Sequence, residues 1–207
     1  MSCSPIAVGR GGRAGKSRLV LVLLVLCLIG CQSDGTPPEE ALGQLEARRQ
    51  KARKLYERAL ELSNADRKRQ LYEQAGELDD RLGPAHANLG VLLFREGDHY
   101  EAAQHLQRAA DLMSEDPTPY ANLAVLHAEV SQWNRALEYA KKAKERDGQH
   151  ILTLRTMARA LIETRDSKKR IKEALRDVIQ RDPSERWRRW AIRQSKAIED
   201  QSPLWEQ

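Results

Sequence analysis

The sequence predicts an all-α protein, a solenoid made of stacked helix pairs. The triplet Asn88-Leu89-Gly90 returns 34 residues later as Asn122-Leu123-Ala124, and Ala102 returns at the same interval as Ala136. The apolar side chains are mostly Leu and Ala and aromatic residues make up only 5%, a composition that favours helices over sheets. A fixed period of about 34 residues over helical sequence is typical of repeat proteins in which each repeat is one helix pair.

The N-terminus predicts an export signal over residues 1–30, which is removed. Residues 1–18 carry the basic side chains of Arg10, Arg13, Lys16 and Arg18 and no acid, and Leu19–Ile29 is an unbroken apolar run. Because a transmembrane helix needs about 20 apolar residues, this run is too short to span a membrane. A basic head before a short apolar segment is typical of a secretory signal peptide.

The end of this run, Leu28-Ile29-Gly30-Cys31, resembles a bacterial lipobox. The resemblance implies cleavage before Cys31 and a diacylglyceryl group on its sulfur, and two acyl chains anchor a protein stably. The alternative is an ordinary signal peptide followed by a chance cysteine. In lipoproteins of enteric-type bacteria, an Asp after the lipidated Cys favours the inner membrane. Gln32 stands at that position here, so we expect a lipid-anchored protein on the periplasmic face of the bacterial outer membrane, with the inner membrane as the less favoured alternative.

The segment after the signal, residues 31–37, predicts a lipidated Cys31 and a short linker. Six residues reach about 20 Å at most, so the folded part is expected close to the membrane surface. Thr36 before Pro37-Pro38-Glu39-Glu40 predicts the start of a helix, because Pro is tolerated in the first turn and acids favour its positive end.

Charge and motifs exclude several classes of function. Loss of the four basic residues of the signal lowers the formal charge from +5 to about +1, which removes support for a nucleic-acid partner. The scattered histidines form no zinc motif, and the chain shows neither a Ser-His-Asp order nor a glycine-rich phosphate loop. We therefore expect no enzyme activity and no cofactor.

Two repeats, 83–116 and 117–150, resemble tetratricopeptide repeats. Small residues such as Gly90, Ala102, Ala124 and Ala136 stand where paired helices cross closely. A third repeat, 151–183, fits when its turn holds one extra residue, and 38–82 forms a degenerate N-terminal repeat. Residues 184–200 predict a C-terminal capping helix, and 201–207 form a tail. The resemblance implies a right-handed αα superhelix.

The same resemblance implies that the first helix of each repeat lines a concave groove for a protein or peptide. The Asn amides offer donors and an acceptor to an extended backbone, although a solvated Asn is the competing interpretation. Some tetratricopeptide-repeat domains bind C-terminal carboxylates through a clamp of Lys, Asn and Arg side chains. Glu57 stands at one of the clamp positions with the wrong charge, so we do not expect this binding mode. The groove candidates are Asn88, Val91, Phe94, Arg95, Asn122, Val125, Glu129, Arg155, Arg159 and Ile162.

The last helix interleaves basic and aromatic residues and leaves two interpretations open. In the first, Trp187 and Trp190 face the stack and the arginines are solvated. In the second, the arginines contact anionic lipid or an envelope polymer, with the solenoid as a spacer. The candidates for that contact are Arg186, Arg188, Arg189 and Arg193.

The function that these patterns favour is a membrane-anchored scaffold or adaptor for protein–protein interactions in the bacterial cell envelope. In plan the chain resembles lipidated repeat proteins that assemble pili, secretion channels or cell-wall machinery. The partners expected are a protein or peptide in the groove and the membrane through Cys31.

Overall fold

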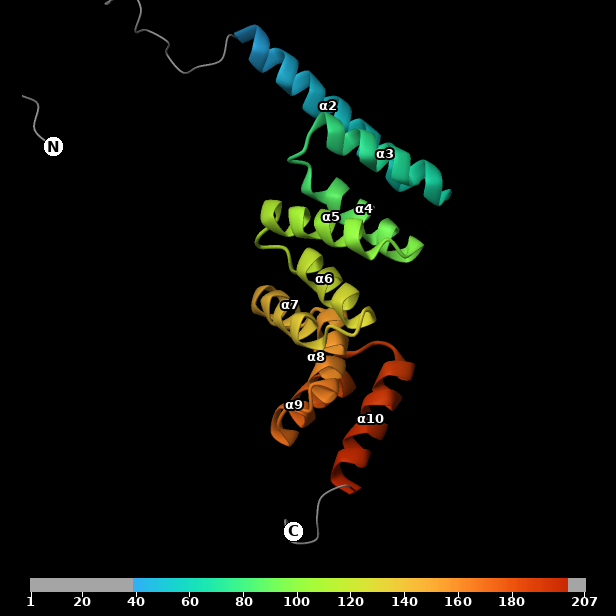
Figure 1. The fold of residues 1–207 in the computed structure, drawn as a ribbon, viewed down its shortest axis with the longest axis vertical. Coiled ribbons are helices and arrows are strands. Elements are labelled where there is room, and N and C mark those ends of the chain that lie inside the picture. The colour runs from blue at the N-terminus through green and yellow to red at the C-terminus, as the bar shows by residue number, and fades with distance from the viewer. Residues whose placement is uncertain (1–38, 201–207) are drawn as a thin grey trace, which may run out of the picture. The chain divides into compact units, whose positions relative to one another are not determined.

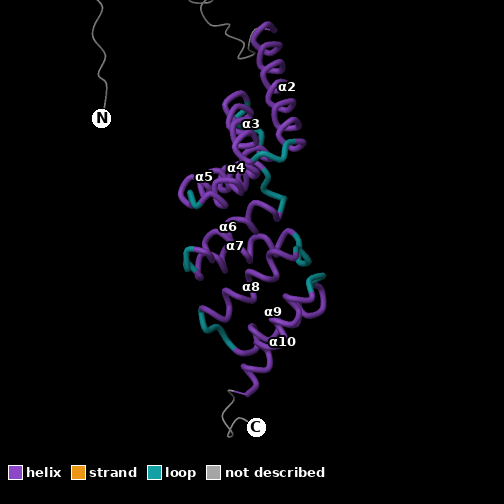
Figure 2. The backbone as a smooth tube through the Cα atoms, turned by 90° about the vertical axis from the view of Figure 1, so that its right-hand side faces the viewer, coloured by secondary structure: helices purple, strands orange, loops and turns teal. Residues whose placement is uncertain are grey.

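A computed structural model describes residues 39–200, and every regular element in that range is a helix (Figures 1 and 2). The signal, Cys31, the linker and the tail lie outside the described residues. The helices are α2 (Glu39–Glu61), α3 (Ala65–Leu78), α4 (Gly83–Glu96), α5 (His99–Leu112), α6 (Pro117–Glu129), α7 (Trp133–Arg146), α8 (Ile151–Glu163), α9 (Lys168–Arg181) and α10 (Glu185–Asp200).

The helices from α4 onward pack as consecutive antiparallel pairs, α4 with α5, α6 with α7, and α8 with α9. Each new pair rests on the one before, since α6 contacts α5 and α8 contacts α7. The first helices of the pairs, which we call A helices, also contact one another, α4 with α6 and α6 with α8. The arrangement is therefore an αα solenoid with its A helices side by side.

Gly90 lets α4 approach α5 closely. A Cβ built at this position would lie 2.7 Å from Cγ of Leu106 and 3.1 Å from the carbonyl oxygen of Ala102. Ala102 itself is fully buried, as are Ala124 and Ala136 at the equivalent crossing of α6 and α7. Small residues thus stand where the sequence predicted them, because larger side chains would separate the helix axes.

The turn inside each pair repeats one backbone feature. Gly97, Ser131 and Arg165 all have positive φ, at 91°, 57° and 52°. They follow one another at the repeat interval, so the left-handed residue marks the same place in every pair. Only Gly97 takes this conformation without strain from a Cβ.

Counted from the residue of positive φ, the third pair has one residue more before its second helix than the other two pairs. One residue separates Gly97 from α5, whereas two residues, Asp166 and Ser167, separate Arg165 from α9. Ser167 caps α9 by accepting a hydrogen bond from the backbone N–H of Arg170. The shift places Ile171, Leu175 and Val178 in the core, on the face that the extra residue predicted.

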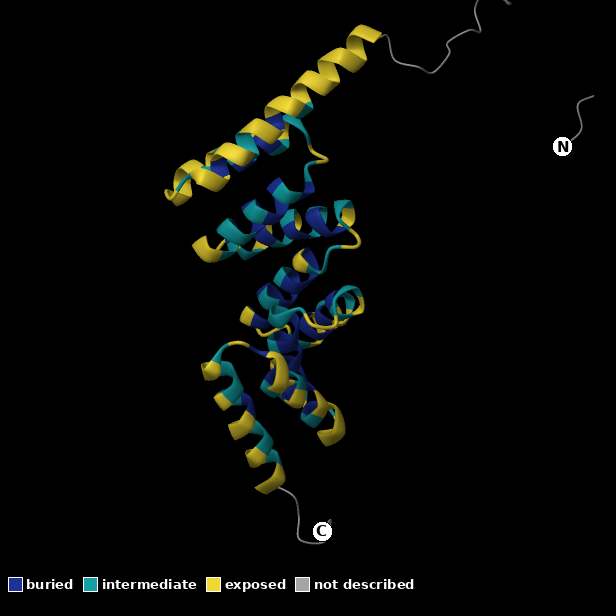
Figure 3. Cartoon of the chain, turned by 180° about the vertical axis from the view of Figure 1, so that it is seen from behind, coloured by how far each residue is buried: buried dark blue, intermediate teal, exposed yellow. Residues whose placement is uncertain are grey.

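The core runs through the stack as two adjoining clusters, one reaching from α2 to α8 and one from α6 to α10. Figure 3 shows the buried residues where helices face one another and exposed residues on the outer surfaces. At the C-terminal end, α10 packs on α9, buries Ala191 and half-buries Trp187 and Trp190. It covers the apolar surface that the last pair would otherwise expose, as a capping helix does.

At the N-terminal end, α2 is longer than the other helices, at 23 residues. Its second half joins the core, since Ala52 and Ala59 are fully buried and the ring of Tyr56 lies 5.8 Å from that of Tyr72 in α3. Its first turns, Glu39–Gln44, belong to a separate unit of the chain and are exposed.

Candidate functional site

The accessible surface of α6 is a single stripe. Apart from Pro117, which begins the helix, its only residues that are not buried are Thr118, Asn122, Val125 and Glu129. Their spacing of four, three and four places them on one side of the helix. The other side chains of α6 are buried, so these four residues form its accessible side on this face of the stack.

Similar stripes lie on the neighbouring A helices. The accessible residues of α4 include Asn88, Val91 and Arg95, and those of α8 include Arg155, Arg159 and Ile162. Because α6 contacts both α4 and α8, the three stripes stand on adjacent helices. We call this surface the A-helix face, and define it by Asn88, Val91, Arg95, Asn122, Val125, Glu129, Arg155, Arg159 and Ile162.

The two asparagines of this face differ in their contacts. Nδ2 of Asn88 donates to the hydroxyl oxygen of Tyr72 at 3.3 Å. Burial raises the pKa of Tyr72, so its hydroxyl stays protonated at neutral pH. The amide of Asn122 is half-buried and makes no hydrogen bond within residues 39–200. Asn122 therefore keeps its full donor and acceptor capacity for a ligand.

Charged side chains flank the asparagines. Arg95 and Glu129 are exposed and form no ion pair with any other residue of the described part. The half-buried Val91 and Val125 each lie one turn earlier on the same helices. Phe94, the remaining candidate on α4, packs its ring 5.5 Å from His99 and so contributes to the fold. The face thus combines apolar contact, an unpartnered amide and unpaired charges of both signs.

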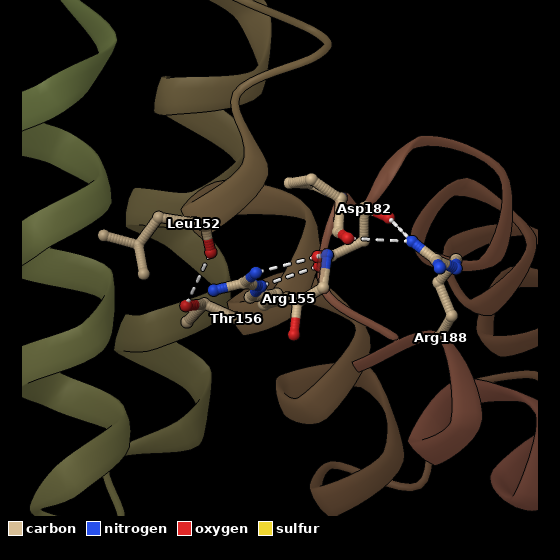
Figure 4. Close-up of polar contacts among 7 residues, drawn as sticks. Leu152, Arg155, Thr156, Asp182 and Arg188 are labelled. Atoms are coloured by element: carbon tan, nitrogen blue, oxygen red, sulfur yellow. Dashed lines mark hydrogen bonds and ion pairs between the residues drawn. The ribbon is translucent and has the colours of Figure 1, made fainter. Parts of the chain in front are cut away.

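Arg155 makes a contact that the sequence pattern did not indicate (Figure 4). Its Nε and Nη2 atoms donate to the two carboxylate oxygens of Asp182, each at 2.7 Å. The Asp182 side chain is only 1% exposed. Cζ of Arg155 also lies 5.1 Å from the ring centroid of Trp187 on α10. These contacts hold Arg155 as a link between α8 and the end of the stack.

The same aspartate organises the turn between α9 and α10. It accepts from the backbone N–H of Ser184 at 2.8 Å, and Nη1 of Arg188 donates to its carbonyl oxygen at 2.7 Å. The guanidinium of Arg155 is the main cause that lowers the pKa of Asp182 below its usual value, so this carboxylate stays charged.

The other arginines that the sequence proposed as binding residues differ in whether their charge is already paired. Arg159 is exposed, with its Cζ 5.6 Å from the ring centroid of Trp133. Arg189 pairs with Glu185 one turn earlier on α10. Arg186 and Arg193 are exposed and form no ion pair within the described range. With Arg188 turned to the backbone, two of the four basic-helix candidates retain a fully available charge.

Two open cavities lie beside the second helices of the pairs, away from the A-helix face. One, of about 540 Å³, is lined by α5, α6 and α7 and includes His127 and Tyr139. The other, of about 320 Å³, is lined by α3, α4 and α5 and includes His86 and His105. Burial lowers the pKa of His127. Its ring stacks on that of Tyr139, with 5.2 Å between the ring centroids.

The second cavity contains a histidine pair that no motif predicted. Nε2 of His86 lies 3.1 Å from the carbonyl oxygen of Asp80, to which it donates, and its Nδ1 lies 3.0 Å from Nδ1 of His105, so one of these two nitrogens donates to the other. Burial, and then the charge of His86, lower the pKa of His105. Within residues 39–200 no cluster of His, Cys, Asp or Glu side chains is arranged to hold a metal ion.

None of the helices between residues 39 and 200 combines the length and apolar character that crossing a membrane requires. The longest, α2, carries charged residues throughout its length.

Comparison with solved structures defines the class of fold: the chain has the tetratricopeptide-repeat fold. It is similar to YrrB, described as a tetratricopeptide-repeat protein with an unusual peptide-binding site, at a TM-score of 0.62 and 18% identity over 75% of this chain and 81% of that one. A tetratricopeptide-repeat protein from Parabacteroides merdae ATCC 43184 gives 0.62 and 15% identity over 73% of this chain and 61% of that one. A double mutant of MamA has a TM-score of 0.60 and 12% identity, over 74% of this chain and 89% of that one.

No protein-family model matches the chain, and no curated protein matches its sequence.

Proposed function

We propose that the chain is a lipid-anchored adaptor of the bacterial cell envelope that holds a protein or peptide partner on its A-helix face. The observation that supports it most is the single accessible stripe of α6, which continues onto α4 and α8. The likeness to a repeat protein with a peptide-binding site supports a peptide as the kind of partner.

The binding mode follows from the chemistry of the face. Val91 and Val125 offer apolar contact, and the unpartnered amide of Asn122 can both donate to and accept from a peptide backbone. Arg95 and Glu129 bring opposite charges that select the side chains of the partner and its direction. An extended segment with apolar side chains and at least one charge fits this arrangement.

Two alanine variants test the binding face. Asn122→Ala removes the amide that has no partner inside the chain, so partner capture from solubilised envelopes should fall by about 5- to 50-fold. Lys141→Ala, at an exposed position of α7 in the same repeat, is the matched control. Equal capture by both variants would place the partner on another surface.

The anchor is tested separately at Cys31, which lies outside the described residues. Cys31→Ser removes the acceptor of the lipid, and we expect the protein to leave the membrane fraction after a high-salt wash. A variant that stays with membranes after this wash would show that the anchor lies elsewhere. Separation of the two membranes then tests the expected outer-membrane location.

The machinery that such an adaptor serves belongs to the same proposal. Assembly of a pilus, a secretion channel or the cell wall requires proteins that gather partners close to a membrane, and a short linker after Cys31 keeps the solenoid there. The alternative function, lipid or polymer binding through α10, has less support because Arg188 and Arg189 are already engaged.

A further inference from the structure

The outer side of α2 carries a stripe of basic residues. Arg48, Lys51, Lys54 and Arg58 follow one another at intervals of three, three and four, so they lie on one side of the helix. All four are exposed. We call them the basic stripe of α2. The helix directs other positions, Ala52 and Ala59, into the core, which leaves the basic stripe with no packing role.

The charges of the stripe are not used inside the described part of the chain. None of the four side chains forms an ion pair or a hydrogen bond within residues 39–200. Some basic residues elsewhere in the fold are paired, as Arg69 is with Glu73 and Lys144 with Asp177. A row of unpaired cations about 15 Å long on a helix held by the core is a preformed surface for an extended anionic partner.

The acids of α2 do not neutralise the stripe. Between Arg48 and Arg58 the only acid is Glu57; Glu39, Glu40 and Glu46 precede that interval, and Glu61 follows it at the end of the helix. Arg49 and Arg53 add further positive charge to the same stretch. The local field over the middle of α2 is therefore positive.

The position of the stripe in the chain indicates which anionic partner it meets. Glu39, the first described residue of α2, follows Cys31 by eight residues. A lipid on that cysteine would hold α2 beside the membrane surface whatever else the protein binds. The closest extended anionic surface is then a layer of phospholipid headgroups, and basic residues near such a surface are attracted to it.

We propose that the basic stripe of α2 binds anionic phospholipid headgroups and lays the first helix of the solenoid along the membrane. The inference rests on the proposed lipid anchor for its setting, although the binding itself does not require the lipid. Arg48, Lys51, Lys54 and Arg58 make the contact, and the A-helix face is left to the protein partner.

The test uses the protein without its lipid, residues 32–207. This truncation removes no described core residue, because the buried residues begin at Ala52. Co-sedimentation compares phosphatidylcholine vesicles with vesicles that also contain about 30% phosphatidylglycerol. We expect binding to the anionic vesicles only, and loss of that binding when salt is raised to about 0.5 M.

Matched charge variants locate the contact. The α2 variant changes four residues to Gln, namely Arg48, Lys51, Lys54 and Arg58. The α10 variant changes four exposed residues of α10 to Gln, namely Arg186, Arg189, Arg193 and Lys196. Loss of four contacts at about fivefold each should weaken binding by the α2 variant more than about 100-fold. The α10 variant, which loses the same charge, should bind like the original protein. Circular dichroism and melting temperature establish that both are folded.

Three results would overturn the inference. The original protein could ignore anionic vesicles, the α2 variant could bind as well as the original, or both variants could lose binding equally, which would make net charge the cause. A loss confined to the α10 variant would assign the contact to the last helix. None of these results bears on the anchor, which the Cys31→Ser fractionation measures independently.

Discussion

The ion pair between Arg155 and Asp182 joins α8 to the turn before α10, with Asp182 almost wholly buried and Arg155 partly exposed. A buried carboxylate without its countercharge is strongly unfavourable, even where the intact pair adds little net stability. The hydrogen bond from Ser184 satisfies only part of the Asp182 carboxylate. The pair therefore specifies how the capping segment attaches to the stack.

Replacing Arg155 alone should expose this dependence. Arg155→Met leaves Asp182 buried and unpaired, and we expect the free energy of unfolding to fall by about 3 kcal/mol. Adding Asp182→Asn removes the charge while keeping an acceptor for Ser184, so the double variant should recover part of the loss. Urea unfolding of the two single variants and the double variant gives the coupling. Strict additivity would mean that the two side chains do not depend on each other.

His105 should make the stability of the protein sensitive to mild acid. The pKa of His105 is lowered in the folded protein, whereas an unfolded histidine titrates near about 6.5. The unfolded chain therefore binds more protons below that pH, and the contribution of the neutral ring is lost as pH falls from about 6.5 through the lowered folded value.

His105→Gln checks this sign, because Gln retains a donor and an acceptor but does not titrate. We expect urea midpoints of the original protein to fall between about pH 7 and about pH 5, and the His105→Gln variant to fall less. His127, whose pKa burial also lowers, should account for part of the remaining slope. If the urea midpoints of both proteins change equally with pH, His105 does not contribute to the pH dependence of stability.

At the scale of the helix pair, close packing was the most predictable feature of the chain. The recurring small residues indicated where α4 meets α5 and α6 meets α7, because few side chains fit a close crossing. The extra residue in the third turn was also visible, as the apolar positions of α9 are displaced by one. The positive φ of Ser131 and Arg165 was not, since neither residue type indicates a left-handed conformation.

Gly90→Ala measures the closeness of the crossing. Alanine favours a helix over glycine by about 1 kcal/mol, but here its Cβ meets a backbone oxygen 3.1 Å away and Cγ of Leu106. Because overpacking costs about 1–3 kcal/mol, we expect a net loss of stability by thermal unfolding. Gly43→Ala is the control, since a Cβ there has no neighbour within 4 Å. If both substitutions stabilise the protein, the crossing of α4 and α5 has enough space for a Cβ at position 90, and the close packing proposed here is wrong.

At the scale of the whole molecule, the face of the solenoid was more predictable than the contacts on it. A repeat length and a helical period suffice to select Asn88, Val91, Asn122 and Val125 as an accessible row on adjacent helices. They cannot assign Arg155 to Asp182, because that pair forms between a helix and a turn 27 residues away. Nor could a search for sequence motifs find the pair of His86 and His105, which only packing brings together.

Site-specific photocrosslinking in intact envelopes tests the central claim most directly. A photoreactive residue at position 125 stands on the stripe of α6, and one at position 141 stands on the exposed side of α7 in the same repeat. If the A-helix face holds the partner, position 125 gives a discrete protein adduct that Asn122→Ala diminishes, and position 141 gives none. Equal adducts from both positions, or an adduct from position 141 alone, would contradict the account.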